Sequence, residues 1–86
     1  MQRYLISYEF NDGEDQEIGG DMLVQWYETG GVENRPETYE VQSWVFMIQN
    51  GNGHCVVRAD SLDTIWKLWH PWRKLMDISI QPCLDL

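Results

Sequence analysis

Apolar and polar residues alternate along two stretches of the chain, residues 3–10 and 76–82, and this alternation predicts a β-strand over each. The clearest stretch is RYLISYEF, in which Tyr4, Ile6, Tyr8 and Phe10 fall on one face of a strand. Two Asn-Gly pairs in NGNG (50–53) predict a hairpin between the second and third strands. We expect strands over residues 3–10, 38–48, 54–59 and 76–82.

A helical period of apolar residues lies between the first two strands. Ile18, Met22 and Trp26 recur every four residues, and this spacing predicts a helix within residues 15–31. The pair at Gly30 supplies a C-terminal stop. The two adjacent glycines, Gly19 and Gly20, weaken the first turns, so we expect the helix to start late.

A second helix is predicted from residue 62, capped by Asp60 or Ser61. Pro71 lacks an N–H and disfavours helix for the residue before it, so the helix should end or kink near Trp69, with a further turn after it. This region contains the decapeptide WKLWHPWRKL (66–75), which is basic and rich in tryptophan.

The decapeptide is interpreted as one apolar helix face with basic residues outside. On a helical wheel one sector contains Leu62, Ile65, Trp66, Trp69, Trp72 and Met76. We therefore predict that Trp66 and Trp69 pack on the sheet as core. The alternatives are a tryptophan-lined ligand or partner groove, most plausible at Trp72, and binding to a membrane surface, which the short helix and the acidic chain disfavour.

The predicted order β-α-β-β-α-β is that of one α+β, ferredoxin-like domain over residues 1–86. Two right-handed crossovers around a central hairpin give a four-stranded antiparallel sheet in the order 4-1-3-2. Both helices then lie on one face of the sheet.

The second predicted strand is apolar on both faces from Trp44 onward. Val45 and Met47 lie on one side, and the side chains of Trp44, Phe46 and Ile48 lie on the other. A sheet face in water should alternate cleanly, so both faces require cover. We predict a homodimer packed through the helix-free faces, with Trp44, Phe46 and Ile48 at the interface. The alternatives are an uncovered patch or a strand end that curls over a helix edge.

The formal net charge of −8 limits the partners that the chain can bind. Ten of the fourteen acids lie between Glu9 and Glu40. Such a surface repels phosphate, so we expect no nucleic-acid partner and no membrane partner. No stretch reaches the roughly 20 apolar residues of a membrane span, and the N-terminus does not resemble a signal peptide.

A cytoplasmic location follows as the default expectation, and there the two cysteines should be thiols. Cys55 falls on the third strand and Cys83 just past the fourth, with the first strand between them. Their Cα atoms should therefore lie about 10 Å apart or more, too far for a disulfide.

No catalytic spacing is evident in the sequence. His54 and Cys55 are adjacent in a strand and point to opposite faces, so they cannot bind one metal ion together. We expect no metal site and no cofactor. The polar residues best placed to serve a ligand site are His54, Arg58, Asp77 and Ser79, together with Trp72.

Several segments resemble, in order, the bacterial family known as domain of unknown function 3303. They are the opening RYLISYEF, the ETGG that ends the first helix, SWVFMI before the hairpin, VVRADSLDTIWKLW, and the closing LMDISIQPCLD. That family is similar to the dimeric α/β-barrel superfamily. The resemblance implies a ferredoxin-like fold and a dimer, but no particular reaction.

Three classes of function remain open. The favoured one is a non-catalytic homodimeric module that binds a small molecule or a protein. The second is a small dimeric α/β-barrel enzyme, such as an oxygenase or isomerase, with or without haem, which the resemblance implies. The third is an acidic adaptor for a basic protein partner.

Overall fold

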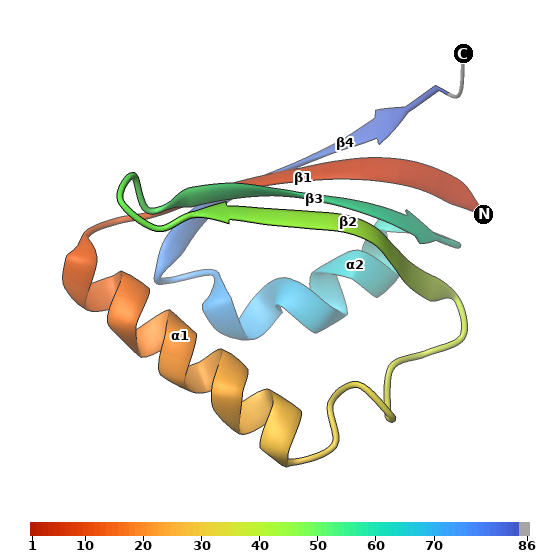
Figure 1. The fold of residues 1–86 in the computed structure, drawn as a ribbon. Coiled ribbons are helices and arrows are strands. Elements are labelled where there is room, and N and C mark those ends of the chain that lie inside the picture. Colours follow the sequence, from red (N-terminus) through yellow and green to blue (C-terminus); the bar gives the residue numbers. More distant parts are fainter. Residues whose placement is uncertain (85–86) are drawn as a thin grey trace.

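The computed structural model describes residues 1–84. In chain order the elements are β1 (Gln2–Phe10), α1 (Gly13–Glu28), β2 (Tyr39–Met47), β3 (Asn52–Ala59), α2 (Leu62–Trp69), a 3₁₀ turn η1 (His70–Trp72) and β4 (Met76–Cys83). The strands form one antiparallel sheet in the order β2-β3-β1-β4, with both helices on the same face (Figure 1). The predicted ferredoxin-like fold and strand order are confirmed.

Helix α1 starts earlier than the sequence predicted. Asp12 is its N-cap, and the Asp12 carboxylate accepts a 2.8 Å hydrogen bond from the backbone N–H of Asp15. This cap satisfies one of the helix's free N–H groups. Gly19 is needed for packing, because a Cβ there would lie 2.5 Å from the Phe10 ring. The missing side chain lets α1 approach the sheet closely at this point.

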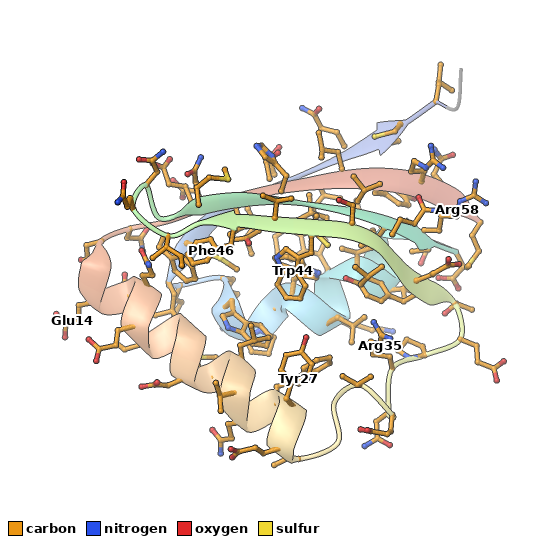
Figure 2. All side chains as sticks on the ribbon, in the orientation of Figure 1. Glu14, Tyr27, Arg35, Trp44, Phe46 and Arg58 are labelled. Atoms are coloured by element: carbon orange, nitrogen blue, oxygen red, sulfur yellow. The ribbon has the colours of Figure 1, made fainter. Side chains whose placement is uncertain are left out.

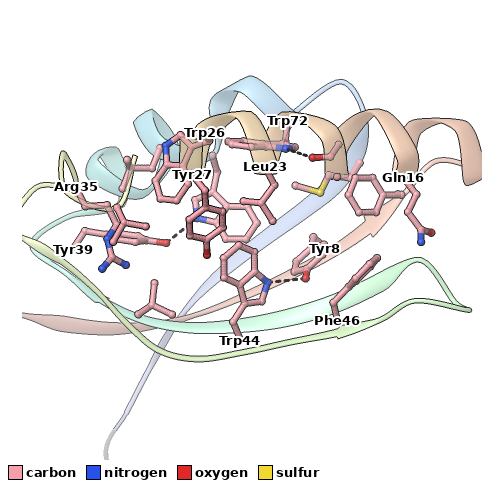
Figure 3. A pocket seen from close by; sticks show the side chains of 18 residues that line it. Tyr8, Gln16, Leu23, Trp26, Tyr27, Arg35, Tyr39, Trp44, Phe46 and Trp72 are labelled. Atoms are coloured by element: carbon pink, nitrogen blue, oxygen red, sulfur yellow. Dashed lines mark hydrogen bonds between the residues drawn. The ribbon is translucent and has the colours of Figure 1, made fainter. Parts of the chain in front are cut away.

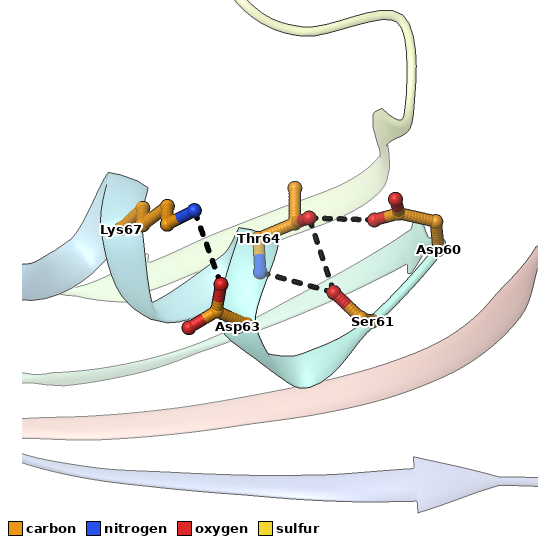
Figure 4. Close-up of polar contacts among 5 residues, drawn as sticks. All are labelled: Asp60, Ser61, Asp63, Thr64 and Lys67. Atoms are coloured by element: carbon orange, nitrogen blue, oxygen red, sulfur yellow. Dashed lines mark hydrogen bonds and ion pairs between the residues drawn. The ribbon is translucent and has the colours of Figure 1, made fainter.

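The second helix begins and ends as predicted. Ser61 caps α2, and its hydroxyl accepts a 3.3 Å hydrogen bond from the Thr64 N–H (Figure 4). The Thr64 hydroxyl in turn donates to the Asp60 carboxylate at 2.6 Å, so both predicted capping residues contribute. The helix ends at Trp69 and continues as the 3₁₀ turn that contains Pro71.

The prediction for Trp66 is wrong. Ile65 is fully buried and Trp69 is 7% exposed, whereas Trp66 is 38% exposed. Ile65 and Trp69 are four residues apart and form the line of α2 that faces the sheet, and Trp66 lies to one side of it. The buried face of α2 is therefore narrower than the sequence predicted.

Strand β2 contains a β-bulge at Gln42 that changes which side chains face the helices. Val41 pairs with Val57, and Ser43 pairs with Val56, the adjacent residue of β3. The extra residue inverts the alternation for the rest of the strand. The Gln42 amide oxygen accepts a 2.9 Å hydrogen bond from the Nε of Arg3, which links the bulge to β1.

Because of the bulge, Trp44 and Phe46 point toward the helices and not toward the helix-free face (Figure 2). The expectation that they cover the helix-free face is therefore wrong. Ile48 lies in the hairpin turn after β2 and is 71% exposed. Whether these three residues contact a second copy stays a prediction.

The core lies between the sheet and α2. Its buried members are Ile6, Tyr8, Tyr39, Cys55, Val57, Ala59, Ile65, Trp69 and Met76. Both cysteines are free, as predicted, since Cys55 lies on β3 and Cys83 on β4, with β1 between them. Helix α2 packs on the sheet, whereas α1 leans away from it toward its C-terminal end (Figure 1).

Candidate functional site

A cavity of about 470 Å³ lies between the sheet and the two helices. This volume is within the range of about 300–1,000 Å³ that is typical of small-molecule sites. Nine of its eighteen lining residues are aromatic: Tyr8, Phe10, Trp26, Tyr27, Tyr39, Trp44, Phe46, Trp69 and Trp72 (Figure 3). The cavity is therefore walled mainly by aromatic rings.

Hydrogen bonds fix three of the indoles in the wall. Trp44 Nε1 donates to the Tyr8 hydroxyl at 2.8 Å, and Trp69 Nε1 donates to the Tyr39 hydroxyl at 3.0 Å. Trp72 Nε1 donates to the Gly19 carbonyl at 3.1 Å. These bonds join β2 to β1, α2 to β2, and η1 to α1. These three bonds satisfy the indole N–H groups and leave the carbon faces of the rings available to a ligand.

Both hydrogen-bonded tyrosines are neutral phenols at physiological pH. Burial raises the pKa of Tyr39 to about 12, although the bond from Trp69 acts in the opposite direction. Burial also raises the pKa of Tyr8, opposed by the bond from Trp44. Each hydroxyl accepts from an indole, and the Tyr8 hydroxyl donates its own proton to the Val45 carbonyl at 3.5 Å. Within residues 1–84 the Tyr39 hydroxyl donates to no protein acceptor.

Arg35 is the one charged residue among those that line the cavity. It comes from the loop between α1 and β2 and lies next to Tyr39 (Figure 3). Its positive charge tends to lower the pKa of Tyr39, a further sign that the two groups are close. The Nε of Arg35 is buried and makes no hydrogen bond within residues 1–84.

Comparison with protein families gives one match. The model of the domain of unknown function known as DUF3303 matches residues 2–86, nearly the whole chain. The chain belongs to this family. No curated protein matches the chain.

The site residues predicted for this DUF3303 member are divided between two places. Trp72 lines the aromatic cavity. His54, Asp77 and Ser79 line a shallow cleft of about 290 Å³ on the helix-free face, and Arg58 lies on that same face, further along β3. The structure therefore does not bring the five residues together, and a ligand role for each stays a prediction.

The shallow cleft contains a Ser-His pair. The Ser7 hydroxyl and His54 Nδ1 are 3.2 Å apart, within reach for a hydrogen bond. Nucleophilic catalysis also needs a third group that orients the histidine. Among the described residues no side chain hydrogen-bonds the other ring nitrogen of His54, and His54 is exposed. The pair therefore lacks the oriented base that such chemistry requires.

Sequence reasoning missed most of the cavity. Arg35 was not among the predicted site residues, and Trp44 and Phe46 were assigned to the wrong face. The sequence carries no periodic signal for Arg35, which lies in the loop directly before Pro36 and four residues before Tyr39.

Within residues 1–84 no three His, Cys, Asp or Glu side chains form a cluster that could hold a metal ion. Neither α1 nor α2 is long and apolar enough to cross a membrane.

Proposed function

We propose that this protein is a binding module whose aromatic cavity takes an apolar, ring-containing small molecule. The observation that carries the proposal is the fixed aromatic wall between Trp44, Trp69 and Trp72. Rings held by their own hydrogen bonds are preorganised, so little conformational entropy is lost when a flat ligand stacks on them. The rim remains open, since Tyr27 and Trp44 are 51% and 42% exposed.

Binding is favoured over catalysis because the cavity contains few groups that can transfer a proton. Tyr8 and Tyr39 are held neutral by burial, and a guanidinium such as that of Arg35 does not serve as a base in proteins. An enzyme that acts by proton transfer would require a general base near the ligand. The adaptor alternative and a cytoplasmic location stay predictions.

The test uses naphthalene-2-carboxamide, a neutral aromatic probe, in ligand-observed NMR and calorimetry. We expect wild-type protein to bind it and Val41→Trp to lose binding, because Val41 lines the cavity and a tryptophan there would fill it. The matched control is Val24→Trp, since Val24 lies on α1, is 56% exposed and does not line the cavity.

Two outcomes would contradict the proposal. One is the absence of binding to wild-type protein, and the other is undiminished binding to Val41→Trp. Thermal unfolding of each variant confirms that it is folded before binding is compared.

A homodimer stays part of the proposal, but its support now comes from other residues than Trp44, Phe46 and Ile48. The helix-free face presents an apolar strip formed by Leu5, Val45, Met47 and Val56. Val45 is 53% exposed, and the other three are half-buried. Packing this strip against a second copy would remove apolar surface from water and enlarge the small core.

A further inference from the structure

Arg35 is charged, and among the described residues its Nε has no hydrogen-bond acceptor at the end of a mainly apolar cavity. Its Nε is buried, and within residues 1–84 its side chain makes neither an ion pair nor a hydrogen bond. The chain holds fourteen acids, yet none of those described is paired with this guanidinium. A buried donor without an acceptor is unfavourable, and an acceptor brought by a ligand would relieve that cost.

Tyr39 places a second donor beside Arg35. Its hydroxyl accepts from Trp69 Nε1 at 3.0 Å, which leaves the phenolic proton to donate. Burial raises the pKa of this hydroxyl to about 12, so the proton is retained. Arg35 and Tyr39 therefore place two donors side by side at one end of a mainly aromatic wall (Figure 3).

We infer that the cavity selects an aromatic monocarboxylate, with its ring against the indoles and its carboxylate on Arg35 and Tyr39. This inference rests on the proposed function. A guanidinium matches the two oxygens of a carboxylate through paired hydrogen bonds.

The charge distribution favours one negative charge over two. Arg35 is the single cation at the cavity, and the chain has a net charge of −8. A phosphate dianion would meet one cation and a repulsive field, whereas a carboxylate is neutralised by Arg35 alone.

The test compares naphthalene-2-carboxylate with naphthalene-2-carboxamide, which has nearly the same shape and no charge. We expect wild-type protein to bind the carboxylate about tenfold more tightly, as measured by calorimetry at pH 7.5. Arg35→Gln should bind both probes with the affinity that wild-type protein has for the carboxamide. Arg73→Gln is the matched control, because it removes the same charge from an exposed residue outside the cavity.

Each outcome has a distinct meaning. Equal affinities of wild-type protein for the two probes would overturn the inference while the proposed function stands. Persistence of the carboxylate preference in Arg35→Gln would overturn the role of Arg35. Failure of both probes to bind would remove the proposed function and this inference with it. The wild-type comparison decides the charge preference whether or not Arg35→Gln folds.

Discussion

Trp44 and Tyr8 are joined by a 2.8 Å hydrogen bond that runs from the indole Nε1 of an edge strand to a phenol on a central strand. The bond crosses the sheet on its helix side and spans β3, which lies between the two strands. It holds the Trp44 ring over the cavity, although that side chain is 42% exposed.

This hydrogen bond should couple Trp44 and Tyr8 energetically. In a double-mutant cycle of Tyr8→Phe and Trp44→Phe, we expect a coupling energy of about 0.5–1.5 kcal/mol from urea unfolding. Tyr8→Phe combined with Trp66→Phe is the control and should be additive, because Trp66 lies outside the core. A coupling near zero for the first pair would contradict a fixed Trp44 ring.

Two tryptophans of the same helix should differ sharply in their contribution to stability. Trp69→Ala removes a buried ring and the bond to Tyr39, and should cost about 3–5 kcal/mol in the free energy of unfolding. Trp66→Ala should cost less than about 1.5 kcal/mol, since that ring is 38% exposed. Denaturant unfolding of both variants measures the difference. Similar losses would mean that Trp66 belongs to the core after all.

The adjacent glycines of α1 provide a matched pair of substitutions. Gly20→Ala should raise stability by about 0.5–1 kcal/mol, because a Cβ there meets no atom within 4 Å and alanine favours helix. Gly19→Ala should lower stability despite the same propensity gain, because its Cβ would lie 2.5 Å from the Phe10 ring. Thermal melting of the two variants compares them directly. A gain at both positions would show that α1 can shift away from Phe10 at little cost.

Stability should fall at alkaline pH. Burial raises the pKa of the Cys55 thiol and of the Tyr39 phenol to about 12 each. In an unfolded chain the cysteine thiol ionises at about pH 8.5 and the tyrosine phenol at about pH 10. Above these pH values the unfolded state has lost protons that the folded state still holds. The free energy of unfolding should therefore have its full value below about pH 8 and should decline as the pH rises toward 12.

Urea unfolding between pH 7 and 10.5 measures this decline, with a limiting slope of about 1.4 kcal/mol per pH unit for each group. Cys55→Ala should abolish the part that begins near pH 8.5 and leave the part due to Tyr39. A constant or rising stability over this range would mean that neither group is buried in solution.

Sedimentation equilibrium at micromolar concentration should give about twice the chain mass of 10.2 kDa. Val45→Asp places a charge in the apolar strip of the helix-free face and should return the protein to monomer. Glu40→Lys, on the same face of β2 but outside the strip, changes charge as a control and should leave the dimer intact. A wild-type monomer would remove the homodimer from the proposal.

The strands could be predicted because the residues that face the helices are apolar at every second position along β1 and β4 and because the Asn-Gly pairs mark the hairpin into β3. Their order followed from the right-handed crossovers of the β-α-β-β-α-β sequence of elements. The bulge could not be predicted, because Gln42 is an ordinary strand-compatible residue and nothing in its identity indicates that one residue is unpaired. That single residue determined whether Trp44 and Phe46 were assigned to the cavity or to the opposite face. Arg35 was missed because its position depends on how the loop after α1 returns to the sheet, and no periodicity records the path of a loop.

The bulge also affects the edge of the sheet. β2 and β4 are the two edge strands, and Gln42 interrupts the first of them while Pro82, which has no N–H, lies in the second. An incoming strand of another chain needs an unbroken row of donors and acceptors to add itself to a sheet. Both interruptions shorten the row that an edge strand presents, which disfavours the lateral addition of another chain to this sheet.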